Sequence, residues 1–299
     1  MTCLLATEVC FLILTQWLTQ QVSSLSQLES SQDLDMTDDA FDDQYNGCTE
    51  EMDKKAPQLL EKELEVNGNL KHEWEMAQRK WKEIRNKADP SKKLNDFQGT
   101  ALVAYTGDIA MEFNKAIRSF HQNSDKFQFK AFHYYLTRAL QLLTTGECHT
   151  VYRGTRIKFV YKGKGNVRFG QFAPSSSSVE AAKNVLFEKR LGTLFTIRTC
   201  LGVYIKNCSY YPSEKEVLIP GYEVFQQVTI PSKDKTYSQY SLTNDGKTLS
   251  KTHDEVSLES PQNFTSNYNC FYSSGMRQHP VFILLLPSLL VLLLLPAEL

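Results

Sequence analysis

Hydrophobic residues gather at the two ends of this chain, whereas apolar and polar positions are mixed between them. The first apolar run, residues 4–14, is shorter than the roughly 20 residues that a membrane-spanning helix needs. The small residues Ser23 and Ser24 follow it, so residues 1–24 are predicted to be a secretory signal. Because this segment contains Glu8 and has no basic start, a buried N-terminal helix is the alternative.

The second apolar run, residues 281–295, lies near the C-terminus and is followed by no basic residue, unlike a typical membrane-spanning helix. A short polar spacer and the small residues Ser273, Ser274 and Gly275 precede it. This arrangement predicts that residues 273–299 are a glycosylphosphatidylinositol (GPI) attachment signal that is removed, with Ser273 as the attachment residue. The mature protein would then lie on the outer leaflet of the plasma membrane. The spacer is shorter than the roughly 8 to 12 residues of a typical signal, which leaves a spanning tail as the alternative.

Between the two signals, the sequence predicts one folded domain over residues 41–272. Residues 25–40 are rich in Ser, Gln and Asp, and we expect them to form a loose lead-in. The first part of the domain, residues 57–145, shows apolar residues at helical spacing. Helices are predicted over residues 57–86 with a break at Asn67-Gly68, over 96–121 and over 126–143.

After Gly146 the sequence changes to short runs of β-branched and aromatic residues separated by Gly and Ser, which favour strands over the part from 148 to 230. The predicted strands cover residues 151–152, 157–161, 167–169, 194–199, 217–219 and 222–230. Residues 231–262 are polar and weakly periodic, and we expect a long loop there. Helices first and strands afterwards predict an α+β fold, in which the helical part packs on a mostly antiparallel β core.

The charges and cysteines narrow the range of functions. The 33 basic and 34 acidic residues nearly balance, for a formal net charge of −1, so the clustered basic face of a nucleic-acid-binding protein is not expected. Five of the seven cysteines lie outside the predicted secretory signal: Cys48, Cys148, Cys200, Cys208 and Cys270. Their spacing fits no zinc motif, so disulfides are expected and a metal site is not. Asn207 and Asn263 begin glycosylation sequons, in keeping with secretion.

The most informative local motif is a Glu-x-Glu pair, Glu214 and Glu216, at the start of a predicted strand. In an extended backbone, side chains at i and i+2 point to the same face, so both carboxylates would address one ligand. Paired carboxylates can stabilise an oxocarbenium-like transition state and accept a proton from a nucleophile. Taken alone, such a pair is more often a solvated surface feature.

Two further motifs point to the binding of a phosphate-bearing ligand. Arg153 offers a planar fork of donors suited to a pyrophosphate, and Gly154 beside it permits close approach of the backbone. The serine run 175–178 supplies hydroxyls that can bond a ribose or orient a carboxylate. The ordinary alternatives are a surface ion pair for the arginine and a flexible loop for the serines.

Together and in this order, these motifs resemble the vertebrate arginine-specific ecto-ADP-ribosyltransferases, in particular the group of rodent T-cell proteins. The resemblance covers about residues 40–272 and agrees with both processing signals. The segments that carry it outside the motifs above are 40–45, 99–107, 130–140, 199–202 and 216–224. It implies the mono-ADP-ribosyltransferase fold, with NAD as a substrate rather than a permanently bound cofactor.

The resemblance also implies roles for the candidate residues. Glu216 would bond the nicotinamide ribose and stabilise the developing cation. Glu214 would bind the guanidinium of the acceptor and assist its attack. Arg153 and Gly154 would hold the NAD phosphates. Further members of the site would be the catalytic serines Ser175 and Ser176 and, as weaker candidates for lining the NAD pocket, Tyr105, Gln171 and Ser209.

The family's paired cysteines imply the disulfides Cys48–Cys270 and Cys148–Cys200, with Cys208 left free. The implied activity is transfer of ADP-ribose from NAD to arginine side chains of surface or extracellular proteins, with NAD hydrolysis as a side reaction. One position departs from the family pattern, because Pro174 stands where the first serine of the serine motif is expected. Proline offers neither a hydroxyl nor a backbone N–H, so a catalytically silent surface glycoprotein with the same fold is the alternative.

Overall fold

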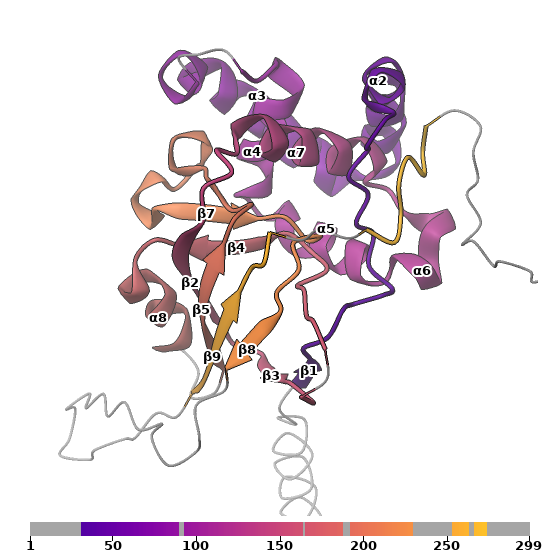
Figure 1. Ribbon diagram of the computed structural model, residues 1–299. Coiled ribbons are helices and arrows are strands. Elements are labelled where there is room, and N and C mark those ends of the chain that lie inside the picture. The colour runs from indigo at the N-terminus through magenta and orange to yellow at the C-terminus, as the bar shows by residue number, and fades with distance from the viewer. Residues whose placement is uncertain are drawn as a thin grey trace, which may run out of the picture.

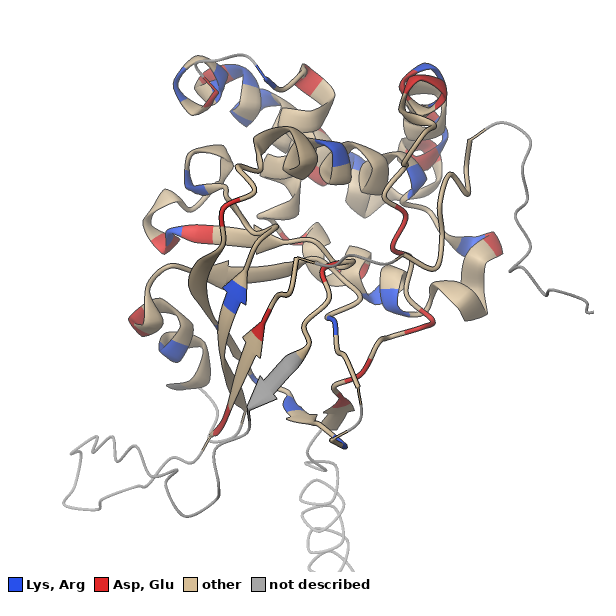
Figure 2. Cartoon of the chain, in the orientation of Figure 1, with Lys and Arg blue, Asp and Glu red and all other residues tan. Residues whose placement is uncertain are grey.

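A computed structural model describes residues 31–89, 93–163, 165–187, 192–229, 253–262 and 266–273 of the protein. In Figure 1 the helices α2, α3, α4 and α7 gather on one side of the molecule, and the sheet lies below them. Basic and acidic residues are interspersed along these helices, as the near balance of charge in the sequence leads one to expect (Figure 2). The protein thus has a helical layer on a β layer, which confirms the predicted α+β class.

Helices cover the predicted regions, but the first begins at Thr49 rather than at residue 57, and the helix expected over 96–121 is broken at residues 106–108 and at Ser119. The helices are α2 (Thr49–Val66), α3 (Gly68–Ala88), α4 (Asp96–Tyr105), α5 (Ile109–Arg118), the short α6 (Phe120–Asn123), the 3-10 turn η1 (Ser124–Lys126) and α7 (Lys130–Leu143). The expected break falls at Asn67, whose side chain accepts a hydrogen bond from the amide of Leu70 and so starts α3. Asn95 and Gln98 form a reciprocal capping box at the start of α4.

Seven strands form the main sheet in the order β6-β7-β4-β2-β5-β9-β8. The strands are β2 (His149–Thr155), β4 (Ala173–Ser176), β5 (Thr193–Thr199), β6 (Val203–Tyr204), β7 (Glu216–Ile219), β8 (Gln227–Thr229) and β9 (Asp254–Glu259). Every neighbouring pair is antiparallel except β5 and β9, which run parallel. The expected mostly antiparallel sheet is therefore present.

The fold begins earlier in the chain than Phe41, where the sequence suggested that it starts. Strand β1 (Ser31–Asp33) pairs in parallel with β3 (Lys158–Val160). Farther along the same stretch, the carbonyl of Met36 accepts a hydrogen bond from the buried side chain of Arg168, which also forms an ion pair with Asp42. The polar composition of this segment suggested a loose lead-in, but long-range contacts order residues 31–40.

The hydrophobic pattern missed the strands β4, β6 and β9 and the helix α8, and residues 167–169, predicted as a strand, form only an isolated bridge between Val167 and Phe225. Strand β9 lies inside residues 231–262, which were expected to form a loop, and it contributes only Val256 and Leu258 to the core. Helix α8 (Val179–Phe187) follows the serine run and packs against β2. With six residues in β9 and nine in α8, these two elements are too short for a clear local periodicity, and their long-range partners stabilise them.

Both implied disulfides are present. Cys48–Cys270 joins the start of α2 to the C-terminal end of the domain, and Cys148–Cys200 joins the chain before β2 to the end of β5. Cys208 is buried and free.

The two predicted processing signals and the sequon at Asn263 lie outside the described residues, whereas Asn207 is exposed on a 3-10 turn. Among the helices that the structure describes, no helix is long and apolar enough to cross a membrane.

Candidate active site

The centre of the site is a row of residues across three neighbouring strands. Glu216 on β7 is paired with Ser176 on β4, and Ser176 is paired in turn with Tyr152 on β2. Arg153 follows Tyr152 directly along β2. Strand pairing therefore brings together residues that are up to 64 positions apart in the sequence, and these strands carry Arg153, Gly154, the first two serines of the run and Glu216.

The two glutamates occupy different environments. Glu216 is buried, with 7% of its surface exposed, whereas Glu214 is exposed in the 3-10 turn η3 (Pro212–Glu214). Burial raises the pKa of the Glu216 carboxyl to about 7, and the nearby charge of Glu214 acts in the same direction. The buried carboxyl is thus poised between its two protonation states near neutral pH.

The i and i+2 argument assumed an extended backbone between these glutamates. The backbone is not extended there. Lys215 has a left-handed conformation with φ of 51°, so the chain turns sharply before it enters β7. Glu214 and Glu216 nevertheless line the same cavity. The turn places one carboxylate at the solvent-exposed rim and the other inside.

Arg153 is one of two arginines that line this cavity, the other being Arg156. The Nη1 atom of Arg153 donates to the carbonyl oxygen of Pro174 at 2.5 Å, and its guanidinium lies 5.7 Å from the centre of the Phe169 ring. The Nε atom is buried and has no hydrogen-bond partner. Burial lowers the pKa of the guanidinium, which still carries its charge at neutral pH. A buried donor without a partner beside an open cavity is suited to an anionic ligand.

The serines hold the turn that carries Glu214. Ser176 Oγ donates to the carbonyl oxygen of Glu214 at 2.8 Å and accepts a hydrogen bond from the amide of Ser178 at 3.1 Å. Ser175 Oγ points elsewhere and donates to the carbonyl oxygen of Ala173 at 3.3 Å. Ser176 therefore connects β4 to the Glu-x-Glu turn, a contact that Ser175 does not make.

These residues surround one cavity of about 400 Å³. Its lining contains Arg153, Gly154, Pro174, Ser175, Ser176, Glu214 and Glu216, together with Tyr152, Arg156 and four residues of α8, namely Ala181, Ala182, Asn184 and Val185. The wall from α8 was missed by sequence reasoning, because nothing in its local pattern marks it as part of a site. The structure thus gathers the Arg, Ser and Glu-x-Glu motifs into one place.

Gly154 has a structural function in this wall. A Cβ atom at this position would lie 1.9 Å from the carbonyl oxygen of Ala182 on α8. No side chain fits there, since a backbone carbonyl cannot move away without shifting the helix. The absence of a side chain at Gly154 lets α8 approach β2 closely enough to close the cavity.

The three weaker candidates, Tyr105, Gln171 and Ser209, do not line this cavity. The buried Tyr105 hydroxyl donates to the carbonyl oxygen of Phe172 at 3.0 Å, just before β4. Ser209 Oγ accepts a hydrogen bond from the amide of Tyr211 at 2.9 Å, just before η3. Tyr105 therefore supports the start of β4, and Ser209 supports the start of η3, both from outside the cavity. Gln171 has a buried Oε1 atom without a hydrogen-bond partner.

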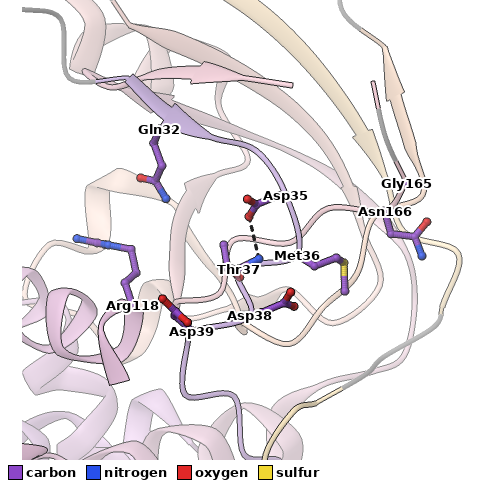
Figure 3. Close-up of a pocket in the computed structure, with 9 residues that line it drawn as sticks. All are labelled: Gln32, Asp35, Met36, Thr37, Asp38, Asp39, Arg118, Gly165 and Asn166. Carbon is purple, nitrogen blue, oxygen red and sulfur yellow. Dashed lines mark hydrogen bonds between the residues drawn. The ribbon is translucent and has the colours of Figure 1, made fainter. Parts of the chain in front are cut away.

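A second cavity, of about 540 Å³, is larger but is a poor candidate for the same ligand. Asp35, Asp38, Asp39 and Arg118 line it (Figure 3), and Asp35 Oδ1 accepts a hydrogen bond from the amide of Thr37 at 2.8 Å. Three carboxylates against one guanidinium disfavour a pyrophosphate by like-charge repulsion. The choice between the cavities therefore rests on charge and not on volume.

Comparisons with known proteins agree with this geometry. The sequence pattern of the family described as NAD:arginine ADP-ribosyltransferase matches residues 34–250. The chain belongs to this family. The sequence is 49% identical to T-cell ecto-ADP-ribosyltransferase 2 of Rattus norvegicus over 294 residues, which are 97% of this chain and 98% of that protein. It is 48% identical to T-cell ecto-ADP-ribosyltransferase 2 of Mus musculus over 300 residues, which are 96% of this chain and 97% of that protein.

Solved structures of this ADP-ribosyltransferase family have the same fold. The eukaryotic mono-ADP-ribosyltransferase ART2.2 has been solved as glutamate mutants in complex with NADH, with a TM-score of 0.68, and with NAD, with a TM-score of 0.69. Each is 49% identical to this chain, and the NADH complex covers 81% of this chain and 99% of the solved chain. The resemblance to the T-cell ecto-ADP-ribosyltransferases and the fold that it implied are thereby confirmed.

Proposed function

We propose that this protein cleaves NAD at its nicotinamide–ribose bond and transfers the ADP-ribose to arginine side chains of surface or extracellular proteins. The observation that carries this proposal is the convergence of Arg153, Ser176, Glu214 and Glu216 on one cavity. Support comes from the NAD and NADH complexes of a relative with 49% identity. The relatives are named ecto-ADP-ribosyltransferases, which supports an extracellular location for this chain as well.

In this proposal Arg153, next to Gly154, holds the NAD phosphates. Its buried Nε donor has no partner in the protein, and its Nη1 atom is already fixed by the Pro174 carbonyl. A guanidinium fixed in this way is preorganised for a pyrophosphate, so little side-chain entropy is lost on binding. Nicotinamide would then lie toward the inner end of the cavity, near Glu216.

Glu216 acts on the bond that breaks. The electron pair of the C1′–N bond leaves with nicotinamide, and a ribosyl oxocarbenium cation develops next to the Glu216 carboxylate. A preorganised negative charge in a partly dry site stabilises such a cation more strongly than water does. The carboxyl must therefore be ionised when the bond breaks.

Glu214 acts on the acceptor. It lies at the exposed rim, where a guanidinium of another protein can reach it. The guanidinium nitrogen attacks C1′, a new C–N bond forms, and the proton that the guanidinium loses passes to Glu214 and then to solvent. Ser176 holds the backbone of Glu214 and thereby fixes the distance between the two carboxylates.

The second candidate function is a catalytically silent surface glycoprotein, and Pro174 favours it. This residue lies in β4 opposite Leu218, where the family pattern has a serine, and its side chain offers the site no hydrogen-bonding group. Incubating the purified protein with labelled NAD and agmatine, a small guanidine, decides between the two. Labelled ADP-ribosyl agmatine is expected, and neither transfer nor hydrolysis would be seen if the silent function is correct.

We further propose that residues 1–24 direct secretion, that a GPI anchor on Ser273 replaces the residues that follow it, and that Asn207 and Asn263 carry glycans. Exposure of Asn207 supports the glycan at this position. The protein would then act on NAD and on arginine-bearing proteins outside the cell, at the outer leaflet.

A further inference from the structure

The C-terminal end of the domain is firmly attached to its helical part. The carboxylates of Asp42 and Asp43 accept hydrogen bonds from the amides of Asn267, Tyr268, Cys270 and Phe271, at distances between 2.8 and 3.0 Å. The disulfide Cys48–Cys270 adds a covalent link. Ser273 follows three residues later, so little freedom separates the proposed anchor residue from the body of the protein.

Tyr272, the residue before Ser273, packs against Phe127 at the end of η1 and against Lys130 at the start of α7. Its ring is parallel to that of Phe127, with ring centres 6.4 Å apart and planes at 3°. The ammonium group of Lys130 lies 5.4 Å from the centre of the same ring. Burial raises the pKa of the Tyr272 hydroxyl, and the charges of Glu63 and Asp125 add to this effect. Tyr272 therefore lies close to both carboxylates.

Glu63 and Asp125 line a cavity of about 300 Å³, which we call the anchor-side cavity, together with Lys62, Lys126 and Lys130. The Glu63 carboxylate is occupied, because it accepts hydrogen bonds from the amides of Ala131 and Phe132 at the start of α7. In the described part of the chain, none of the three lysines forms an ion pair. Three ammonium groups thus face the two carboxylates of Glu63 and Asp125, and the cavity has a surplus of one positive charge.

We propose that the anchor-side cavity binds the phosphate of the ethanolamine-phosphate bridge, the group through which a GPI anchor is joined to the carboxyl of Ser273. This inference rests on the proposed anchor. The bridge places a phosphodiester two carbon atoms beyond the amide nitrogen at Ser273. Covalent linkage gives this phosphate an effective concentration in the millimolar range at the three lysines. A lysine ammonium binds phosphate as a point charge. Water weakens each of these ion pairs, and the three ammonium groups together offset this weakening.

A phosphate held there would set the orientation of the protein on the membrane. In Figure 1 the described chain end lies beside α2 and α6, whereas β7, β4 and α8, which form the candidate active site, lie on the other side of the molecule. With the anchor bridge fixed on the helical side, the opening of the active-site cavity would point away from the lipid surface. Soluble acceptor proteins could then approach Glu214.

The test measures the acetylation rate of single lysines by a water-soluble amine reagent, with quantification by mass spectrometry. Protein released from cells by phosphatidylinositol-specific phospholipase C, which keeps the bridge, is compared with a secreted chain that ends at Ser273. We expect acetylation at Lys62, Lys126 and Lys130 to be at least threefold slower in the anchor-bearing protein at low salt, and equal in both proteins at 1 M salt. Exposed lysines of α3 serve as internal controls and should react equally in both: Lys71, Lys82 and Lys87.

A matched pair of variants tests the same contact through stability. The anchor-bearing protein should have a higher Tm than the chain ending at Ser273. K62Q/K126Q/K130Q should abolish this difference, whereas K71Q/K82Q/K87Q should keep it.

Each contrary outcome has its own meaning. Failure of the phospholipase to release the wild type, with a control protein released, removes the anchor itself and leaves the enzymatic proposal untouched. Equal acetylation in both proteins at low salt overturns the phosphate contact. Protection that persists at 1 M salt shows steric cover by the glycan and overturns it as well. Protection seen only on intact cells, and lost on release, assigns the lysines to lipid head groups instead.

Discussion

The protonation of Glu216 is set by its surroundings rather than by its type. Because burial raises its pKa to about 7, a larger fraction of the carboxyl is ionised as the pH rises through neutrality. If the ionised form stabilises the cation, the rate should fall by about tenfold per pH unit well below this pKa and level off above it. Measuring initial rates of NAD cleavage between pH 5 and 9 checks this. A rate that is flat between pH 5.5 and 8 would contradict the assigned role.

The difference in exposure between the two glutamates predicts different consequences of their replacement. Glu216→Gln removes the charge next to the cation and should lower both transfer and hydrolysis by about a hundredfold or more. Glu214→Gln leaves the inner carboxylate in place, so transfer to agmatine should fall much further than NAD hydrolysis. The two products are quantified in one assay. Glu147→Gln, a change at an exposed glutamate away from the cavity, is the control and should match wild type.

Pro174 lines the cavity, and its carbonyl oxygen orients Arg153. Pro174→Ser adds a hydroxyl and a backbone N–H in β4. It should raise activity by about tenfold or more, which is the value of one charge-assisted hydrogen bond. Pro174→Ala, which restores the N–H alone, separates the two contributions. An inactive wild type together with an inactive, folded Pro174→Ser variant would leave the silent surface glycoprotein as the remaining function.

At the scale of elements, the position of α8 against β2 decides whether the cavity has a closed wall. Gly154→Ala places a Cβ against the Ala182 carbonyl, so α8 must move outward. We expect a loss of about 1 to 3 kcal/mol in the free energy of unfolding and a larger relative loss of activity. Urea unfolding and the NAD assay measure the two effects. Gly68→Ala is the matched control, because nothing lies within 4 Å of its added Cβ.

The turn before β7 shows how an element can change the meaning of a sequence motif. The same two glutamates would point to one face in a strand, yet the left-handed Lys215 separates a rim carboxylate from an inner one. Ser176 secures this turn from the neighbouring strand β4. The motif was recognisable in the sequence, but the division of labour between its members depends on that turn.

At the scale of the whole molecule, Cys48–Cys270 closes a loop with a sequence separation of 222, against 52 for Cys148–Cys200. In the chain-entropy model the longer loop contributes about 5 kcal/mol and the shorter one about 4 kcal/mol. C48S/C270S should therefore be the less stable of the two double variants in urea. A serine substitution at the buried, unpaired Cys208 is the control, because it opens no disulfide loop. Equal stabilities of C48S/C270S and wild type would contradict a structural role of this disulfide.

The sequence by itself determined the features that depend on neighbouring residues and on family resemblance. Helical periodicity located the helical part, Asn67 marked a real helix break, and the Arg, Ser and Glu-x-Glu motifs led to the residues that line one cavity. The resemblance supplied the cysteine pairs that the structure contains. These signals are local, or they are inherited with the motif, so no knowledge of distant contacts was needed.

Only the tertiary structure decided which of these residues meet and what each one contacts. Strand pairing places Ser176 opposite Glu216, the packing of α8 explains why position 154 is glycine, and long-range contacts order the segment before Phe41. Tyr105 lies behind β4 and not in the cavity, because its hydroxyl is taken by a backbone carbonyl 67 positions away. Such contacts bring together residues that are distant in the chain, and no local pattern of apolar and polar residues encodes their partners.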